Sequence, residues 1–162
     1  MKAVLILLPL TALLAGCVSL SRSEVVQPIS AAAAAGGRIE SVTLDRDEGL
    51  KVTPGFDELF KARVKAKTAV CATGSRALRL DASLQRFEKG NPVLIAVAAG
   101  ANVLRGEASL VDVATGKTVG TYKIGKTIVG GRFAVITMGQ AEEQLSDAFG
   151  DELCAEAFKP AP

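Results

Sequence analysis

The chain has 162 residues, of which 49% are hydrophobic and 22% charged, and this length and apolar share indicate one globular domain rather than a disordered chain or a multi-span membrane protein. Its 19 basic and 17 acidic residues nearly balance, so the net charge of +2 does not indicate a nucleic-acid-binding protein. The absence of histidine excludes a His general base, a Ser-His-Asp triad and nearly all catalytic zinc sites.

The N-terminal residues have the pattern of a secretory signal peptide. Met1 and Lys2 give a positive start, and an apolar run from Ala3 to Ala15 follows. As a helix, this run would span about 20 Å, which is too short for a bilayer core of ~30 Å. The sequence therefore predicts a signal peptide over residues 1–16 and not a membrane-spanning anchor.

The end of this run, Leu14-Ala15-Gly16-Cys17, resembles the lipobox of bacterial lipoproteins. The resemblance implies that Cys17 becomes the lipidated first residue of the mature chain, with a palmitate-type anchor on the membrane. Val18 follows, where a residue other than Asp usually directs such proteins to the outer membrane. We expect a lipid-anchored outer-membrane protein that faces the periplasm, or a membrane-anchored extracytoplasmic protein if there is no outer membrane. The alternative is an ordinary secreted protein with an incidental cysteine.

The residues after the lipobox lack apolar periodicity. They include Gln27-Pro28, a run of five alanines and Gly36-Gly37. The sequence predicts a lipidated N-terminus and flexible tether over residues 17–37, one α+β domain over 38–158, and a C-terminal tail over 159–162.

The domain pattern predicts an α+β fold: a mainly antiparallel sheet with two helices packed on one face, in the order β-α-β-(β)-β-β-α. Alternating apolar residues predict strands at 39–44 and 78–84, and a hairpin of 107–113 and 118–124 with Gly116 in its turn. The run 93–104 is so apolar that strand and helix both remain open. Helical spacing predicts a helix over 54–71, with Thr53 as N-cap, and a second helix over 133–158.

The two predicted helices have complementary surfaces. The first is basic over its second half, and the second carries acidic residues along one side, which we interpret as a solvent-exposed face. Exposed ion pairs contribute little, so burial of apolar side chains must dominate the packing; these are Phe60, Val64, Leu145 and Phe149.

Cys71 and Cys154 remain after Cys17 is assigned to lipid. An oxidising compartment favours a disulfide between them, which would join the two helices. The alternative is two buried free thiols.

Three further patterns receive structural interpretations. Residues 120–127 match the phosphate-loop pattern G-x-x-x-x-G-K-[ST], but good strand residues fill its interior, so we interpret it as a chance match. The acidic turn 45–49 lacks the spacing of a calcium loop and is read as solvated. The basic run Lys61 to Lys67 lacks stacking aromatics, which favours a solvated face over a nucleic-acid site, with anionic lipid headgroups as a further alternative.

Several turn and strand segments resemble a family of small envelope lipoproteins of unknown function: Leu84 to Gly90, Leu110 to Lys117, and Gly130 to Phe133. The resemblance implies an α+β fold and an envelope location, and it brings no catalytic residues. Because no nucleophile motif, cofactor motif or metal-ligand pattern occurs, we expect a non-catalytic module that binds an envelope protein or polymer and no nucleic acid. The alternative is a carboxylate-dependent hydrolase or transferase that acts on cell-wall or lipid substrates.

Overall fold

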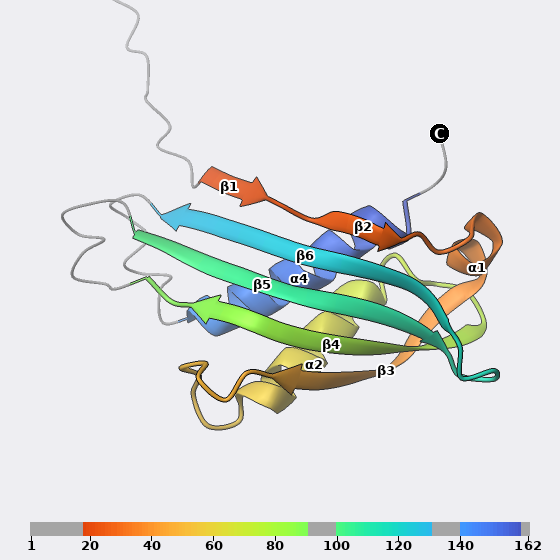
Figure 1. Ribbon diagram of the computed structural model, residues 1–162, viewed down its shortest axis with the longest axis horizontal. Helices are drawn as coiled ribbons and strands as arrows, with labels where there is room; N and C mark the ends of the chain where they lie inside the picture. Colours follow the sequence, from red (N-terminus) through yellow and green to blue (C-terminus); the bar gives the residue numbers. More distant parts are fainter. Residues whose placement is uncertain (1–17, 91–99, 131–139, 160–162) are drawn as a thin grey trace, which may run out of the picture.

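A computed structural model describes residues 18–90, 100–130 and 140–159, and within them the chain has an α+β fold (Figure 1). In chain order the elements are β1 (Val18–Ser21), β2 (Glu24–Gln27), α1 (Ala31–Gly36), β3 (Gly37–Arg46), α2 (Phe56–Thr68), β4 (Arg76–Glu88), β5 (Gly100–Asp112), β6 (Thr118–Gly130) and α4 (Ala141–Ala157). The six-stranded sheet has the order β1-β6-β5-β4-β3, and β2 also pairs with β6. Only the β3–β4 pair is parallel among the pairs described, and α2 lies in the connection between those two strands.

Helices α2 and α4 lie side by side on one face of the sheet (Figure 1). This arrangement and the mainly antiparallel sheet confirm the predicted fold class. No helix of the described residues covers the other face, which we call the open face. Strand alternation explains the difference between the faces: along β4, Leu78 and Leu80 point into the core, whereas Arg79 and Asp81, which alternate with them, stand on the open face.

The interface between the helices and the sheet is built from aromatic and aliphatic side chains. Phe60 of α2 and Phe149 of α4 are fully buried, with ring centroids 5.2 Å apart in an edge-to-face arrangement. Val64 and Leu145 are also fully buried. The four apolar residues predicted to form the helix contact are therefore all buried, and two of them are in ring contact. Full burial of each such side chain is worth about 1.5–3 kcal/mol.

The predicted flexible tether is wrong for the residues that the structure describes. Residues 18–21 and 24–27 form β1 and β2, which pair with the outer edge of β6, and residues 31–36 form α1. Ile29 donates its backbone N–H to the buried Tyr122 hydroxyl at 2.9 Å. The sequences of these short strands show no apolar periodicity. They are ordered instead by tertiary pairing with an available sheet edge.

Several predicted boundaries also change. The segments 100–104 and 107–112 belong to one continuous strand, β5, and the other half of that hairpin extends to Gly130. Helix α2 begins at Phe56 after Gly55, whose φ is 85°, so Thr53 is not its N-cap. The positive φ of Gly116, 67°, confirms the predicted turn. The remainder of the 93–104 run and the predicted helical residues 133–139 lie outside the described residues.

Candidate functional site

The first described strand begins directly after the predicted lipidation residue. Cys17 lies outside the described residues, and Val18 is the first residue of β1. Val18 and Ala101 are both Cα partners of Val129, so β1 and β5 begin at the end of the sheet where β6 finishes. We call this end the anchor end. In the described part of the chain, no helix is both long and apolar enough to cross a membrane.

Glu152 of α4 holds the segment between β1 and β2 onto the body of the domain. Its carboxylate accepts hydrogen bonds from the Ser21 hydroxyl at 2.6 Å, the Ser23 hydroxyl at 2.9 Å and Lys126 Nζ at 2.7 Å. Glu152 is 7% exposed. Burial by itself would raise the pKa of Glu152, but the bonds from Lys126 and the two serines lower it below its ordinary value. The carboxylate is therefore ionised and bonded at neutral pH.

Glu142 makes an equivalent contact near the start of α4. It accepts hydrogen bonds from the Thr53 backbone N–H at 2.9 Å, the Thr53 hydroxyl at 2.5 Å and Lys89 Nζ at 2.7 Å. Burial acts to raise the pKa of Glu142, and Lys89 and Thr53 more than offset that effect. Because Glu142 and Glu152 are both buried, the interpretation of the acidic helix side as a solvent-exposed face is wrong for these two residues.

These two carboxylates stabilise structure and do not have the features of a catalytic acid. A general acid needs a raised pKa and access to substrate, whereas both groups have lowered pKa values and are bonded by neighbouring side chains. No group of three or more metal-ligating side chains that could hold an ion occurs in the part of the chain that the structure describes.

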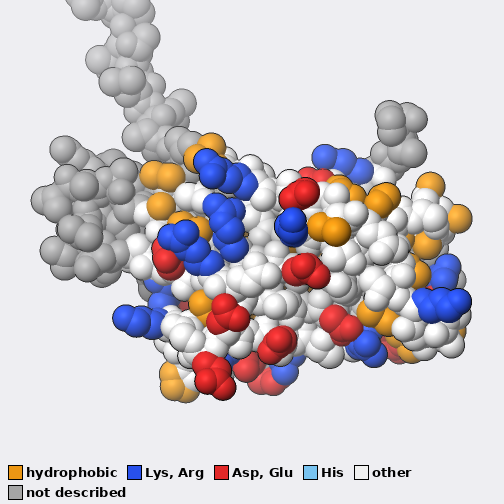
Figure 2. All heavy atoms as spheres, in the orientation of Figure 1, with side chains coloured by type: hydrophobic (Ala, Val, Ile, Leu, Met, Phe, Trp, Pro, Cys, Tyr) orange, Lys and Arg blue, Asp and Glu red, His pale blue; other side chains and the backbone are white. Residues whose placement is uncertain are grey.

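The open face carries charged and hydroxyl side chains in rows that cross the strands. One row contains, in order from β3 to β2, Asp45, Ser83, Glu107, Lys123 and Glu24, which are successive Cα partners. Lys123 and Glu24 form an ion pair at 3.3 Å. In Figure 2, Lys and Arg side chains gather on the upper left of this face, and Asp and Glu side chains spread below them. Basic side chains are therefore concentrated on one part of the open face, and acidic side chains are spread over another part.

A shallow hollow of about 310 Å³ lies on the acidic part of this face and is lined by Thr43, Leu44, Asp45, Asp81, Ala82, Ser83, Glu107 and Ser109. Asp81 accepts two hydrogen bonds from Arg79, at 2.7 and 2.9 Å, and one from the Thr43 hydroxyl at 2.7 Å. The Arg79 guanidinium lowers the pKa of Asp81, so this carboxylate stays ionised. The hollow is acidic and open to solvent.

Cys71 and Cys154 are joined by a disulfide, with an S–S distance of 2.00 Å and Cα atoms 5.7 Å apart. This is the pair that the sequence analysis expected. The bond connects the residues just after α2 with α4, beside the ion pairs of Arg63 with Asp147 and Lys67 with Asp151. It therefore fastens the two helices at one end of their shared interface.

The structure also shows where two other sequence patterns lie, the basic run of α2 and the phosphate-loop match. In the basic run of α2, Lys61 bonds to Glu58 on its own helix, and Arg63 and Lys67 bind carboxylates of α4. Arg63 and Lys67, two of the four basic residues of the run, therefore serve the packing of α2 on α4. The phosphate-loop match at 120–127 lies entirely inside β6, so it lacks the loop and the helix N-terminus that phosphate binding needs.

Sequence reasoning missed the structural roles of Glu142 and Glu152, although a signal for them was present. Glu142, Leu145, Phe149 and Glu152 are spaced by three, four and three residues, so all four lie on one face of α4. Two carboxylates on an apolar helix face must find partners when that face is buried.

No protein-family model matches the chain, and no curated protein matches it. Among solved structures, the chain is similar to the PelC dodecamer from Paraburkholderia phytofirmans, with a TM-score of 0.54, 10% identity, and coverage of 88% of this chain and 100% of that chain. A point variant of that dodecamer gives a TM-score of 0.52 at 12% identity over the same shares of both chains. At this identity, the similarity shows a shared fold.

Weaker structural neighbours include a DUF330 protein from Xanthomonas campestris and a candidate lipoprotein from Caulobacter crescentus CB15. Their TM-scores are 0.49 and 0.44, and their identities are 12% and 13%. The matches cover 79% and 69% of this chain, and 84% and 85% of those chains.

Proposed function

We propose that the protein is a lipid-anchored envelope protein, attached through Cys17 to the outer membrane and facing the periplasm, that acts as a non-catalytic assembly module. The observation that carries the proposal is the position of β1, which begins one residue after Cys17 and is held to α4 through Ser21 and Glu152. A lipid on Cys17 would place the anchor end of the sheet directly at the membrane surface, without an intervening linker.

The edge formed by β1 and β2 is a surface suited to association with a second copy of this chain. Leu20, Val25 and Val26 are 50%, 40% and 51% exposed, and these are three of the five exposed large apolar residues in the described part of the chain. They lie on a strand edge whose outer side pairs with no described strand, which is a favourable surface for adding another chain. The structurally similar PelC is a dodecamer. We therefore propose that copies of this chain associate through the β1–β2 edge.

The anchor and the association need separate experiments. For the anchor, Cys17→Ser should abolish the mass of the attached lipid and move the protein out of the membrane fraction; unchanged processing, mass and fractionation would contradict lipidation. For association, the mass of the detergent-solubilised lipidated protein should exceed that of one copy.

Matched variants then locate the contact. Val26→Lys should shift the particles towards single copies, because it places a charge on the proposed edge. Val113→Lys serves as the control, since Val113 is 49% exposed, like Val26, but lies at the β5–β6 hairpin. A monomeric wild type, or an equal effect of both variants, would contradict self-association and leave the anchor untouched. Crosslinking in intact cells followed by pull-down would identify a different protein or polymer partner.

The second candidate is a hydrolase or transferase that acts through carboxylates on cell-wall or lipid substrates. The acidic hollow favours it, because Asp45, Asp81 and Glu107 line one surface with two serines. The bonded and ionised Asp81 weighs against it, since such an enzyme needs one carboxylate that holds a proton. Turnover of peptidoglycan or phospholipid that is lost in Glu107→Gln, but retained in Glu40→Gln, would establish this candidate instead.

A further inference from the structure

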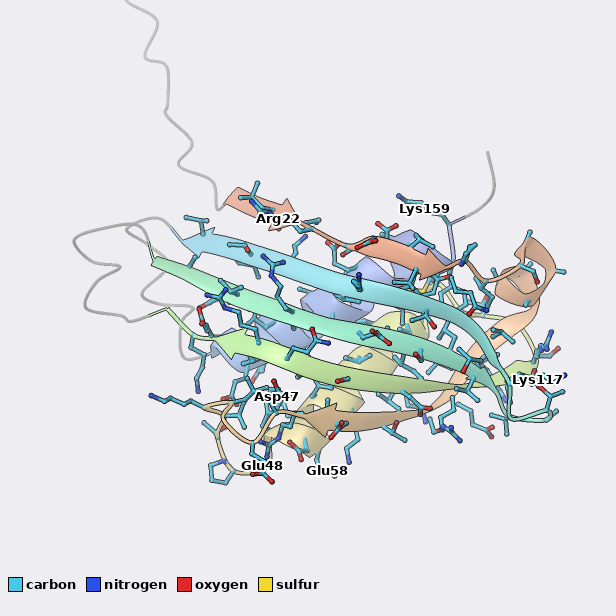
Figure 3. All side chains as sticks on the ribbon, in the orientation of Figure 1. Arg22, Asp47, Glu48, Glu58, Lys117 and Lys159 are labelled. Carbon is cyan, nitrogen blue, oxygen red and sulfur yellow. A yellow bond between two sulfur atoms is a disulfide. The ribbon has the colours of Figure 1, made fainter. Side chains whose placement is uncertain are left out.

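Two arginines on the open face lie on either side of a glycine. The Arg22 backbone N–H donates to the Gly125 carbonyl oxygen at 2.7 Å, and Arg105 is the Cα partner of Gly125 on the opposite side. Arg22 follows Ser21, whose side chain points toward α4, so strand alternation places the Arg22 side chain on the open face. Figure 3 shows Arg22 on the segment between β1 and β2, at the margin of the sheet.

The Arg105 guanidinium extends over Gly125. A Cβ atom on Gly125 would lie 2.6 Å from Arg105 Nη1 and 2.5 Å from the Arg22 carbonyl oxygen. Both backbone groups of Gly125 are occupied, because its N–H also donates to the Ser23 hydroxyl at 3.3 Å. Gly125 therefore has no side chain of its own above its backbone, and the two neighbouring arginines can donate hydrogen bonds there.

Neither guanidinium has a counter-ion within the described residues. Of the acidic residues near them on this face, Glu88 pairs with Arg86 at 2.8 Å and Glu24 pairs with Lys123 at 3.3 Å. Glu107, two residues from Arg105 on β5, makes no ion pair with either arginine in the described residues. Arg105 is nevertheless partly buried. Two arginines without a counter-ion, whose backbones flank one residue, provide an electrostatic site for an anion that can accept from both guanidinium groups.

We propose that Arg22 and Arg105 bind one phosphate group above Gly125. Phosphate suits the pair because the planar guanidinium donates two parallel hydrogen bonds to its oxygens, and several oxygens are available for two arginines at once. The site lies four residues along β6 from Val129, about 13 Å from the anchor end. At that distance the phosphate can come from a lipid headgroup below a tilted sheet or from a phosphorylated solute. The lipid source rests on the proposed anchoring at Cys17, and the phosphate site itself does not.

The test uses the lipidated protein and the arginine reagent phenylglyoxal, with modification rates read for each arginine by mass spectrometry. Arg38 is the internal control, because it is exposed and unpaired in the described structure and lies on β3, at the far edge of the sheet. In neutral detergent, inorganic phosphate at four times its dissociation constant should slow modification at Arg22 and Arg105 about fivefold and leave Arg38 unchanged. No slowing, or equal slowing at Arg38, overturns the site.

Two vesicle preparations distinguish the sources. Slower modification in phosphatidylglycerol vesicles than in phosphatidylcholine vesicles identifies a lipid headgroup, whereas slowing by inorganic phosphate alone identifies a solute. Equal slowing in both vesicles without any effect of inorganic phosphate indicates contact shielding and overturns the proposal. If Cys17 carries no lipid, the phosphate titration still tests the site.

Variants test whether the two arginines act together. Arg22→Gln should weaken phosphate protection at Arg105 about tenfold, because one charge-assisted hydrogen-bonding partner is lost. Arg38→Gln removes the same charge elsewhere and should leave that protection unchanged. Equal protection of Arg105 in Arg22→Gln and the wild type would overturn the shared site.

Discussion

Ser21 and Glu152 lie 131 positions apart in the chain, yet the Ser21 hydroxyl donates to the Glu152 carboxylate at 2.6 Å. Lys126 reaches the same carboxylate at 2.7 Å, so three elements meet there: the β1–β2 segment, β6 and α4. The contact connects the residues after the predicted lipid anchor to the disulfide-bonded helix pair. Through it, a force on the N-terminus would pass to the core and not to a loose linker.

Glu152→Gln should therefore destabilise the domain and release its N-terminal strands. The amide cannot neutralise Lys126, whose side chain is 17% exposed, and cannot accept as strongly from both serines. We expect a loss of about 2–3 kcal/mol in the free energy of unfolding, since a largely buried charge loses its partner. Denaturant titration measures the loss, and hydrogen exchange should increase over residues 18–27.

The control is Glu156→Gln, on the same helix, because Glu156 makes no ion pair or side-chain hydrogen bond in the described structure. If both variants lose equal stability, Glu152 is not the residue that holds the N-terminal strands.

Asp112 should contribute stability that depends on pH. It accepts from the Thr115 hydroxyl and backbone N–H at 2.7 and 2.8 Å, and from Arg76, and these bonds lower the pKa of Asp112 to about 2. Because the folded-state pKa is below its unfolded value, the contribution is present above about pH 4 and is lost as the pH falls towards about 2. In urea titrations, the difference between the wild type and Asp112→Asn should shrink across that window.

Asp45→Asn is the comparison for this experiment, since Asp45 has no bonded partner in the described residues. This variant shows how far removal of one carboxylate charge by itself changes the free energy of unfolding. A pH-independent difference for Asp112→Asn would show that this carboxylate is not titrating with a lowered pKa.

The sequence predicted the parts of the fold that have their own periodicity. The helix around Phe60 and the strand around Leu80 could be predicted, because each buries one face against the core. Apolar residues therefore recur every three or four positions along the helix and at every second position along the strand. The helix–helix contact followed from the complementary charges and apolar faces of α2 and α4.

The N-terminal strands and the site could not be predicted in the same way. Ser21 and Ser23 have no apolar pattern, and only the edge of β6 and the carboxylate of Glu152 give them a fixed place. Likewise, Arg22 and Arg105 are separated by about half of the chain, and only the strand register brings them to Gly125. Long-range pairing of this kind depends on the sheet order, which local spacing does not encode.

Apolar packing should outweigh the ion pairs at the helix interface. Phe149→Ala should cost about 3–5 kcal/mol, because it removes a fully buried ring from Phe60 and leaves a cavity. Asp151→Asn removes a pair whose side chains are 37% and 59% exposed, and it should change the free energy of unfolding only slightly. Denaturant titration compares the two variants, and a larger loss in Asp151→Asn would reverse this ranking.

The disulfide should be the last constraint that holds the helix pair when the chain unfolds. Closing a separation of 83 residues restricts the unfolded chain, and on the chain-entropy model this stabilises the fold by up to about 4 kcal/mol. Protein purified without reductant should have a mass two hydrogens lower than after reduction, and reduction should lower the midpoint of denaturation. The Cys71→Ser, Cys154→Ser double variant should resemble the reduced wild type and show no further loss with reductant, which separates loss of the bond from other effects of the reagent. Two freely alkylatable thiols in unreduced native protein, or equal midpoints with and without reductant, would contradict a structural role for the bond.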